Sequence, residues 1–292
     1  MTRQPCCGRR NQERLRNQPD ASFVQVRTGG FGRKGSQEVV GIFSSLSMKS
    51  TLIVLFAAVA AANSAIAGEC ANSGALGTAR DLVVHPEERL GVGPGYPALG
   101  LGRDEIILTF DDGPNPGTTS RILDILAREC IRATFFMIGK RAEAQPELVR
   151  RMLADGHSLG SHSYSHRRLD TLAPEAAAED IERGYEAVEK AAFGSTAERP
   201  RLVRFPEYKS TPDLKAFAQA RKGIIANTHI SPEDWRGQPA EQTMARLRAL
   251  FDRRTNGILG LHDDQRHTVD LLPMVIAEMR TRHMQIVHLV VK

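Results

Sequence analysis

The sequence has few aromatic residues and no long apolar run. Its 292 residues include one Trp and four Tyr, and aromatic residues make up 5% of the chain. Without basic runs interleaved with aromatics it lacks the charged stripe and stacking platforms of nucleic-acid-binding proteins. It also lacks internal repeats and low-complexity linkers. A hydrophobic content of 41% with 25 Gly and 15 Pro excludes a disordered chain, a collagen and a coiled coil.

The positive charge is concentrated in the N-terminal leader. Residues 1–67 contain nine Lys or Arg and three Asp or Glu, so their net charge is +6. The remaining 30 basic and 31 acidic residues give a net charge of −1. The formal charge of +5 therefore describes the leader, and nothing in the body suggests a nucleic-acid partner.

Segment 48–67 has the three parts of a secretion signal in order. These are a short positive start (Met48-Lys49), an apolar run of eleven residues (52–62) and a small-x-small cleavage site (65–67). The alternative is a membrane helix, but crossing a bilayer takes about 20 apolar residues. We expect a signal peptide, a periplasmic or secreted protein, and no stable membrane insertion.

Residues 1–47 are Arg-rich and precede the signal, where no prefix is expected. We interpret them as a mis-assigned or disordered extension, with translation starting at Met48; a transit peptide is the alternative. Residues 68–292 form the remaining domain. Within it, export leaves Cys70 and Cys130 as an even pair in an oxidising compartment, and a disulfide between them would close a loop of about 60 residues. Two buried free thiols are the alternative.

From residue 105 the sequence alternates β-rich runs with helix-period segments. The seven expected strands are 105–110, 133–138, 157–160, 201–205, 223–227, 257–261 and 285–291. The expected helices are 118–130, 146–155, 174–193, 212–220, 239–253 and 268–282. Repeated strand-helix units predict an α/β fold with parallel strands, either a (β/α) barrel or an open doubly wound sheet. In both, the strand-to-helix loops converge at the carboxyl ends of the strands, where catalytic side chains gather.

Two adjacent carboxylates, Asp111 and Asp112, follow the first of these strands in the run T-F-D-D-G-P. Neighbouring residues after a strand point in different directions, so one carboxylate can bind a cation while the other accepts a proton. A structural Asx-turn is the alternative interpretation of this turn.

The second motif places His162 and His166 four residues apart, a spacing that on a helical turn puts both imidazoles on one face. Two imidazoles with one carboxylate form a common catalytic zinc set with an open coordination position. Structural zinc sites are rich in thiolate, which the two remaining cysteines do not supply.

His262 ends the sixth strand, where it is either a structural histidine or the proton donor opposite a base. Arg204 and Asp234 also lie at the expected rim. They are either surface ion-pair partners or the groups that orient the base and the acid. We interpret the histidines at 157, 229, 267, 283 and 288 as structural or solvent-facing.

Taken in order, these motifs resemble those of the NodB-homology polysaccharide deacetylases, carbohydrate esterase family four. The agreement with the family in order and spacing extends over residues 104–292. The matching motifs are T-F-D-D-G-P, H-S-x-S-H, an Arg-x-Pro segment, Asp-Trp and a late strand ending in His. Residues 68–103, with Cys70 and Cys130, also look like a secreted proteobacterial branch of that family. The resemblance implies a distorted (β/α)7 barrel of the NodB-homology type and a catalytic domain over 68–292.

The resemblance also implies a role for each motif residue. Asp112, His162 and His166 match the metal ligands, for Zn²⁺ or another divalent ion such as Co²⁺. The catalytic positions are Asp111 as base, His262 as acid, Arg204 and Asp234 as the residues that tune them. Trp235 and Tyr208 match substrate-binding positions.

Two positions depart from the family pattern. Glu207 stands where the family has a Tyr whose backbone donates to the oxyanion, and Tyr208 is one residue later. Gly260 stands where the family has a Leu that lines the acetyl pocket. Losing that side chain forfeits about 2 kcal/mol of apolar contact, so we expect a looser acetate site or room for a bulkier acyl group.

The resemblance implies metal-dependent removal of N-acetyl groups from N-acetylglucosamine units of a polysaccharide such as chitin oligomers or peptidoglycan. Two alternatives stay open: an O-acetyl polysaccharide esterase, and a catalytically weakened metal-containing protein that binds glycans. We expect a polysaccharide or oligosaccharide as partner and a monomeric chain.

Overall fold

The computed structural model describes residues 72–86, 88–91 and 98–292. The expected extension, the signal peptide and Cys70 lie outside these ranges, so the predictions made for them stay predictions. Across the described part of the chain, no helix is both long enough and apolar enough to cross a membrane.

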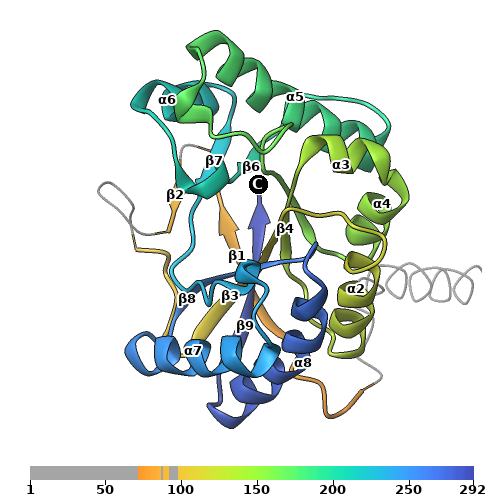
Figure 1. Ribbon diagram of the computed structural model, residues 1–292, viewed down its shortest axis with the longest axis vertical. Coiled ribbons are helices and arrows are strands. Elements are labelled where there is room, and N and C mark those ends of the chain that lie inside the picture. Colours follow the sequence, from red (N-terminus) through yellow and green to blue (C-terminus); the bar gives the residue numbers. More distant parts are fainter. Residues whose placement is uncertain (1–71, 87, 92–97) are drawn as a thin grey trace, which may run out of the picture. The chain divides into compact units, whose positions relative to one another are not determined.

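All strands of the described residues pair in parallel in a single sheet (Figure 1). In chain order they are β1 (Thr78–Val84), β2 (Arg89–Leu90), β3 (Glu105–Asp111), β4 (Thr134–Met137), β5 (Ser158–Ser161), β6 (Arg201–Val203), β7 (Gly223–Ala226), β8 (Gly257–His262) and β9 (Gln285–Val291). Their order in the sheet is β1-β9-β3-β4-β5-β6-β7-β2, with β8 also paired to β3.

The helices that connect and cover these strands are α2 (Thr119–Arg128), α3 (Gly139–Ala144), α4 (Pro146–Ala154), α5 (Pro174–Phe193), α6 (Pro212–Ala220), α7 (Ala240–Arg253) and α8 (Arg266–Thr281). Three of them, α4, α5 and α6, begin with Pro, whose fixed φ suits the first helical position. The hydroxyl of Thr211 caps α6 by accepting a hydrogen bond from the Leu214 amide.

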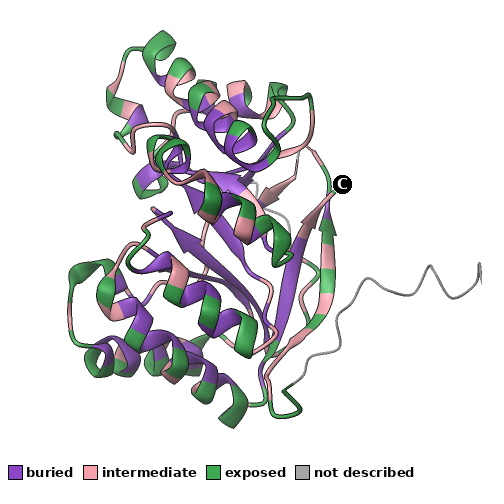
Figure 2. Ribbon diagram, turned by 90° about the vertical axis from the view of Figure 1, so that its right-hand side faces the viewer, coloured by how far each residue is buried: buried purple, intermediate pink, exposed green. Residues whose placement is uncertain are grey.

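The strands from β8 through β3 to β7 form a distorted barrel. β3 is buried along its whole length, which agrees with its almost continuous apolar sequence EIILTFD. The barrel closes between β7 and β8 through a single bridge, Ile230 to Leu259, rather than through a full strand. Buried residues of the strands face one another inside, and the helices turn their buried sides to the sheet and their exposed sides outward (Figure 2).

The expected α/β fold is confirmed, and all seven predicted strands and six predicted helices are present. β1, β2 and α3 were not predicted. β2 and α3 are only two and six residues long, too short for a periodic pattern. β1 alternates partly buried and exposed residues and pairs only with β9, so its sequence carries a weak apolar signal.

Candidate active site

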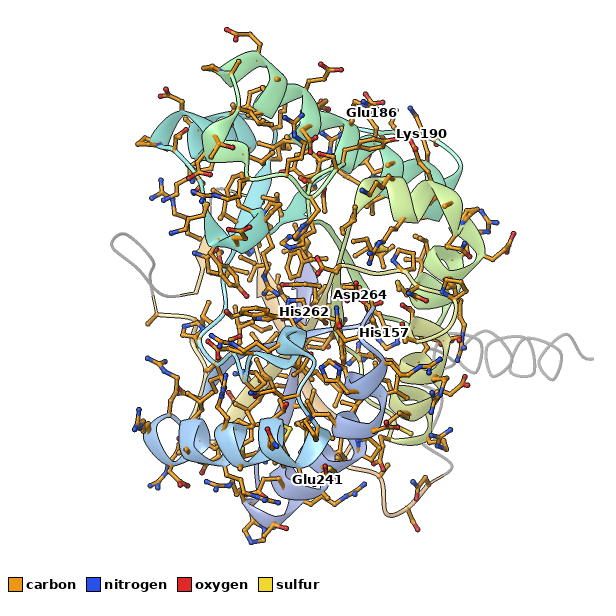
Figure 3. The ribbon with its side chains drawn as sticks, viewed as in Figure 1. His157, Glu186, Lys190, Glu241, His262 and Asp264 are labelled. Carbon is orange, nitrogen blue, oxygen red and sulfur yellow. The ribbon has the colours of Figure 1, made fainter. Side chains whose placement is uncertain are left out.

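The carboxyl ends of β3 and β8 meet at one rim of the barrel. Asp111 is the last residue of β3 and lies in register with His262, the last residue of β8. Together they face a cavity of about 520 Å³. The cavity is lined by Asp111, Asp112, His162, His166, Glu207, Tyr208, Ser231, Trp235 and His262. Most residues predicted from the sequence therefore surround a single space, and Figure 3 labels His262 near the middle of the view.

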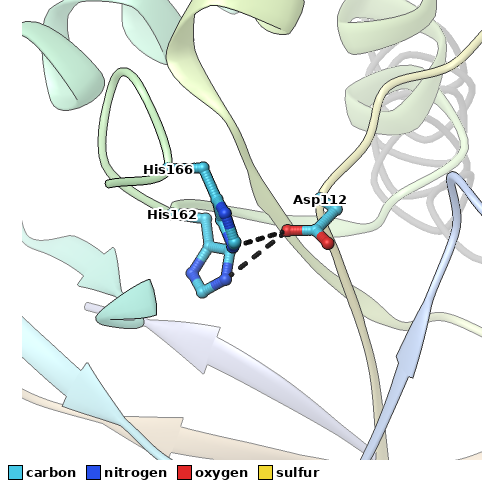
Figure 4. A group of neighbouring side chains, drawn as sticks. All are labelled: Asp112, His162 and His166. Atoms are coloured by element: carbon cyan, nitrogen blue, oxygen red, sulfur yellow. Dashed lines mark ion pairs between the residues drawn. The ribbon is translucent and has the colours of Figure 1, made fainter. Parts of the chain in front are cut away.

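Asp112, His162 and His166 form one group on this rim (Figure 4). Their candidate ligand atoms all lie within 4.8 Å of one another. Asp112 Oδ1 is 3.1 Å from His166 Nε2 and 3.6 Å from His162 Nε2. Two imidazoles and a carboxylate that converge in this way can hold a divalent metal ion and leave a coordination position open.

The hydrogen bonding of the group fits a cation. His162 Nδ1 donates to the backbone oxygen of Arg204 at 2.7 Å, so the lone pair of this imidazole is on Nε2, facing Asp112. Burial lowers the pKa of His162, although the charges of Asp111 and Asp112 act in the opposite direction, so the neutral form needed for a ligand is favoured. Asp112 Oδ1 is buried and makes no hydrogen bond.

The expected helical turn between the two histidines is wrong. Residues 162–166 form an irregular bend in which Ser163 and His166 have φ values of 63° and 58°. Ser163 Oγ accepts a hydrogen bond from the His166 amide at 3.1 Å. Asp180 of α5 accepts from the amides of Tyr164 and Ser165, so tertiary contacts rather than helical spacing bring the imidazoles together.

The second carboxylate, Asp111, is paired with Arg204 instead. Arg204 Nη1 lies 2.6 Å from Asp111 Oδ1 and 2.9 Å from the hydroxyl oxygen of Thr109. Arg204 Nε donates to the backbone oxygen of Ala226, and the guanidinium lies 4.1 Å from the centre of the Phe136 ring. Arg204 is fully buried, so this contact is a buried ion pair and not a surface one. It keeps Asp111 next to the metal group without making it part of that group.

Opposite Asp111, His262 is held by Asp234. Asp234 Oδ1 accepts from His262 Nδ1 at 2.8 Å, and Asp234 Oδ2 accepts from the His262 amide and from Thr268 Oγ1. Burial on its own lowers the pKa of His262, but the hydrogen bond and charge of Asp234, with smaller contributions from Asp111 and Asp112, outweigh it and raise the pKa to about 9. His262 is therefore protonated at neutral pH, as a general acid must be.

Residues behind the rim support the groups at the cavity, and among them Thr268 has no motif in the sequence that singles it out. Thr268 of α8 donates to the Asp234 carboxylate, and the His267 imidazole hydrogen-bonds the Asp234 carbonyl, which is the structural role expected for His267. The sequence does indicate Asp263 as a residue of the rim, because it directly follows the proposed acid His262.

Asp263 is buried and fastens the loop that carries the two aspartates. Its Oδ1 accepts from the Gly113 amide at 2.9 Å, and its Oδ2 accepts from Thr119 Oγ1 at 2.5 Å. Burial raises the pKa of Asp263 to about 7. Arg141 Nη1 donates to the Asp112 carbonyl at 2.8 Å from the other side of the loop.

Of the remaining predicted residues, some lie at the cavity and others have a structural role. Trp235 is 51% exposed at the cavity, and Tyr208 lines the same cavity. His157 and His229 are structural, because their Nδ1 atoms accept from the amides of Ala133 and Ile258. His288 contacts the Ser158 hydroxyl.

Comparison with known proteins identifies the family. The family described as "Polysaccharide deacetylase" matches residues 100–223. The chain is 34% identical over 163 residues to a chitooligosaccharide deacetylase from Bradyrhizobium, covering 56% of this chain and 72% of that protein. It is also 34% identical over 183 residues to the peptidoglycan-N-acetylmuramic acid deacetylase PdaC of Bacillus subtilis, covering 62% of this chain but only 37% of PdaC.

Solved structures give the same result. The structure of a Bdellovibrio bacteriovorus peptidoglycan deacetylase superimposes with a TM-score of 0.61 at 32% identity, covering 72% of this chain and 59% of that one. Sequence, fold and rim geometry agree, and the chain belongs to the polysaccharide deacetylases of carbohydrate esterase family four, the NodB-homology hydrolases.

Proposed function

We propose that this protein removes N-acetyl groups from N-acetylglucosamine-containing polysaccharide. The observation that carries the proposal is that the candidate metal ligands and the proposed base and acid are different residues at the same rim. The ligand atoms of Asp112, His162 and His166 lie close together. Asp111 and His262 face the same cavity, and each is paired with a buried residue: Asp111 with the basic Arg204 and His262 with the acidic Asp234. A protein that only binds glycans has no need of such a base and acid.

We further propose that the Asp112, His162 and His166 group holds Zn²⁺ or a similar ion such as Co²⁺. A divalent ion at such a site supplies Lewis acidity, which polarises a carbonyl and makes water a stronger nucleophile near neutral pH. The residues of the chain do the rest. Asp111 accepts a proton as water attacks the acetamide carbon, and Arg204 holds Asp111 in place through their hydrogen bond.

The C–N bond then breaks, and His262 donates its proton to the departing nitrogen. The products are acetate and a free amino group on the sugar. The Tyr208 amide already donates to the Phe205 carbonyl at 2.9 Å, so we propose the Glu207 amide as the backbone donor to the oxyanion. Glu207 thereby takes the position of the family Tyr with its backbone alone.

The substrate class is an N-acetylglucosamine polymer, either a chitin oligomer or peptidoglycan. Relatives named as chitooligosaccharide deacetylase and as peptidoglycan-N-acetylglucosamine deacetylase match the chain at 34% and 31% identity. Trp235 is exposed at the cavity and offers a flat apolar face on which a sugar ring can stack. We also propose that the protein is exported through its signal segment, that Cys70 and Cys130 pair, and that the chain acts as a monomer.

Acetate release from a panel of defined N- and O-acetylated glycans tests this function. Each substrate is assayed with the purified protein, with the chelated protein, and after zinc or cobalt is added back. We expect release from N-acetylglucosamine oligomers that stops on chelation and returns with metal. Release only from O-acetylated xylan would show an esterase, and glycan binding without any release would show a binding protein.

A further inference from the structure

Directly behind the Asp111 and His262 pair lies a second pair of residues, Thr109 and Gly260. They are in register across β3 and β8, two residues before the pair at the rim. Side chains alternate along a strand, so positions 109 and 260 face the same side as Asp111 and His262. Tyr208 lies next to Gly260 and lines the cavity, and we call this part of the site its inner wall.

The space beside Gly260 is filled and not empty. A Cβ atom built on Gly260 would lie 2.4 Å from Thr228 Cγ2 and 3.6 Å from the Tyr208 hydroxyl oxygen. The first distance is shorter than real Cβ contacts, so no side chain fits there unless Thr228 moves. The looser pocket that the sequence suggested at this position is therefore closed by Thr228 and Tyr208, which lie far from Gly260 in sequence.

Tyr208 reaches this wall from the loop after β6. Glu207 and Tyr208 both have positive φ, 53° and 58°, and this tight turn directs the Tyr208 ring into the cavity that Asp111 and His262 also line. The Tyr208 hydroxyl and the Thr228 side chain both lie next to Gly260, and Asp111 is close enough to act on the hydroxyl electrostatically. A phenol hydroxyl has one donor hydrogen and two acceptor lone pairs, so it can hydrogen-bond a ligand in the cavity.

In the proposed reaction, the acyl end of the substrate would lie against the inner wall. The polysaccharide has to lie at the open mouth of the cavity, where Trp235 is half exposed. The scissile carbonyl carbon carries the sugar nitrogen on one side and the acyl substituent on the other. When the sugar lies outward and His262 meets the nitrogen, the substituent points inward, toward Tyr208.

Resting on the proposed deacetylase function, we propose that the Tyr208 hydroxyl, which lies next to Thr228 and Gly260, determines which acyl group is removed. The Tyr208 hydroxyl places a hydrogen-bonding group, rather than an apolar side chain, at the inner end of the acyl pocket. The pocket should therefore accept a hydroxylated two-carbon acyl group, N-glycolyl, in addition to N-acetyl, and disfavour N-propionyl, which has nearly the same shape but an apolar end. Each reaction is a simple hydrolysis: water adds its oxygen to the acyl carbon, the C–N bond breaks, and the amine takes a proton.

The test compares glucosamine oligomers that carry N-acetyl, N-glycolyl or N-propionyl groups. In the zinc-loaded protein we expect kcat/KM for glycolyl to exceed that for propionyl by about tenfold, which corresponds to one neutral hydrogen bond. In Tyr208→Phe the ratio should fall to near one, and in Thr228→Val it should fall part of the way. Trp235→Phe is the matched control, because it changes an aromatic residue at the mouth and should leave the ratio unchanged.

A second readout does not depend on turnover. The dissociation constants of glycolate and propionate are measured by calorimetry on zinc-loaded wild-type and Tyr208→Phe proteins, and circular dichroism checks that both are folded. Comparing the two proteins cancels the intrinsic affinity of glycolate for zinc. A ratio that is the same in both proteins, in kinetics or in binding, overturns the role of Tyr208. If no N-acyl substrate is cleaved, the deacetylase function fails, and the carboxylate affinities still decide the role of Tyr208.

Discussion

Arg204 Nη1 lies 2.6 Å from Asp111 Oδ1, and the two side chains are 0% and 3% exposed. The same arginine accepts the Nδ1–H of His162 on its backbone oxygen at 2.7 Å. One residue therefore orients both the proposed base and one proposed metal ligand. Proton transfer by Asp111 and metal binding by His162 therefore both depend on the position of Arg204, although Asp111 is not part of the group formed by Asp112, His162 and His166.

Replacing the base should separate catalysis from metal binding. Asp111→Asn keeps the shape of the side chain but removes its ability to take a proton, so we expect kcat to fall about 10²- to 10⁴-fold while zinc stays bound. His162→Ala should lose both activity and zinc, because it removes a ligand. Zinc content by atomic absorption and acetate release are measured on the same preparations. Wild-type activity in Asp111→Asn would refute the assignment of the base.

Replacing Arg204 alone should destabilise the protein more than replacing Arg204 and Asp111 together. Arg204→Met leaves the buried Asp111 carboxylate without its cation, and we expect the free energy of unfolding to fall by about 3–5 kcal/mol. The double variant Arg204→Met/Asp111→Leu removes both charges and should recover part of this loss. Urea denaturation of both variants measures the difference. A double variant less stable than Arg204→Met would contradict this account.

The pH dependence should report on His262. Its folded-state pKa of about 9 lies above its ordinary value of 6.5, so protonated His262 stabilises the fold fully below pH 6.5, and this contribution is lost as the pH rises toward 9. The activity profile should likewise have an alkaline limb where His262 loses its proton. In Asp234→Asn the carboxylate that raises the pKa is gone, so the limb should move to lower pH. Profiles of kcat/KM for both proteins measure it, and identical alkaline limbs would exclude His262 as the acid.

The buried Asp263 should tune metal affinity without touching the metal group. Asp263→Ala removes the carboxylate that accepts from the Gly113 amide and the Thr119 hydroxyl, and this loosens the loop that carries Asp112. We expect about a 10- to 100-fold loss of zinc affinity. Glu241→Ala, an exposed position on α7 labelled in Figure 3, is the control and should leave affinity unchanged. Competition with a chromogenic chelator measures both, and equal affinities in the two variants would refute the role of Asp263.

The fold was readable from the sequence to a large extent, because its signals are local. Apolar strands and amphipathic helices have their own periodicities, and Pro174 and Gly194 bound the long helix α5 at the positions where such residues begin and end helices. The elements that escaped prediction are short or half exposed.

The sequence by itself determined the alternation of strands and helices, the residue types at the strand ends and the candidate set of two aspartates and three histidines. These depend on near neighbours in the chain. Only the tertiary structure decided which aspartate meets Arg204, that an irregular bend held by Asp180 joins the two imidazoles, and that Thr228 and Tyr208 fill the space at Gly260. The reason is that each of these contacts joins residues from different strands and loops, and their distances are determined by how the barrel packs, which no local pattern in the sequence records.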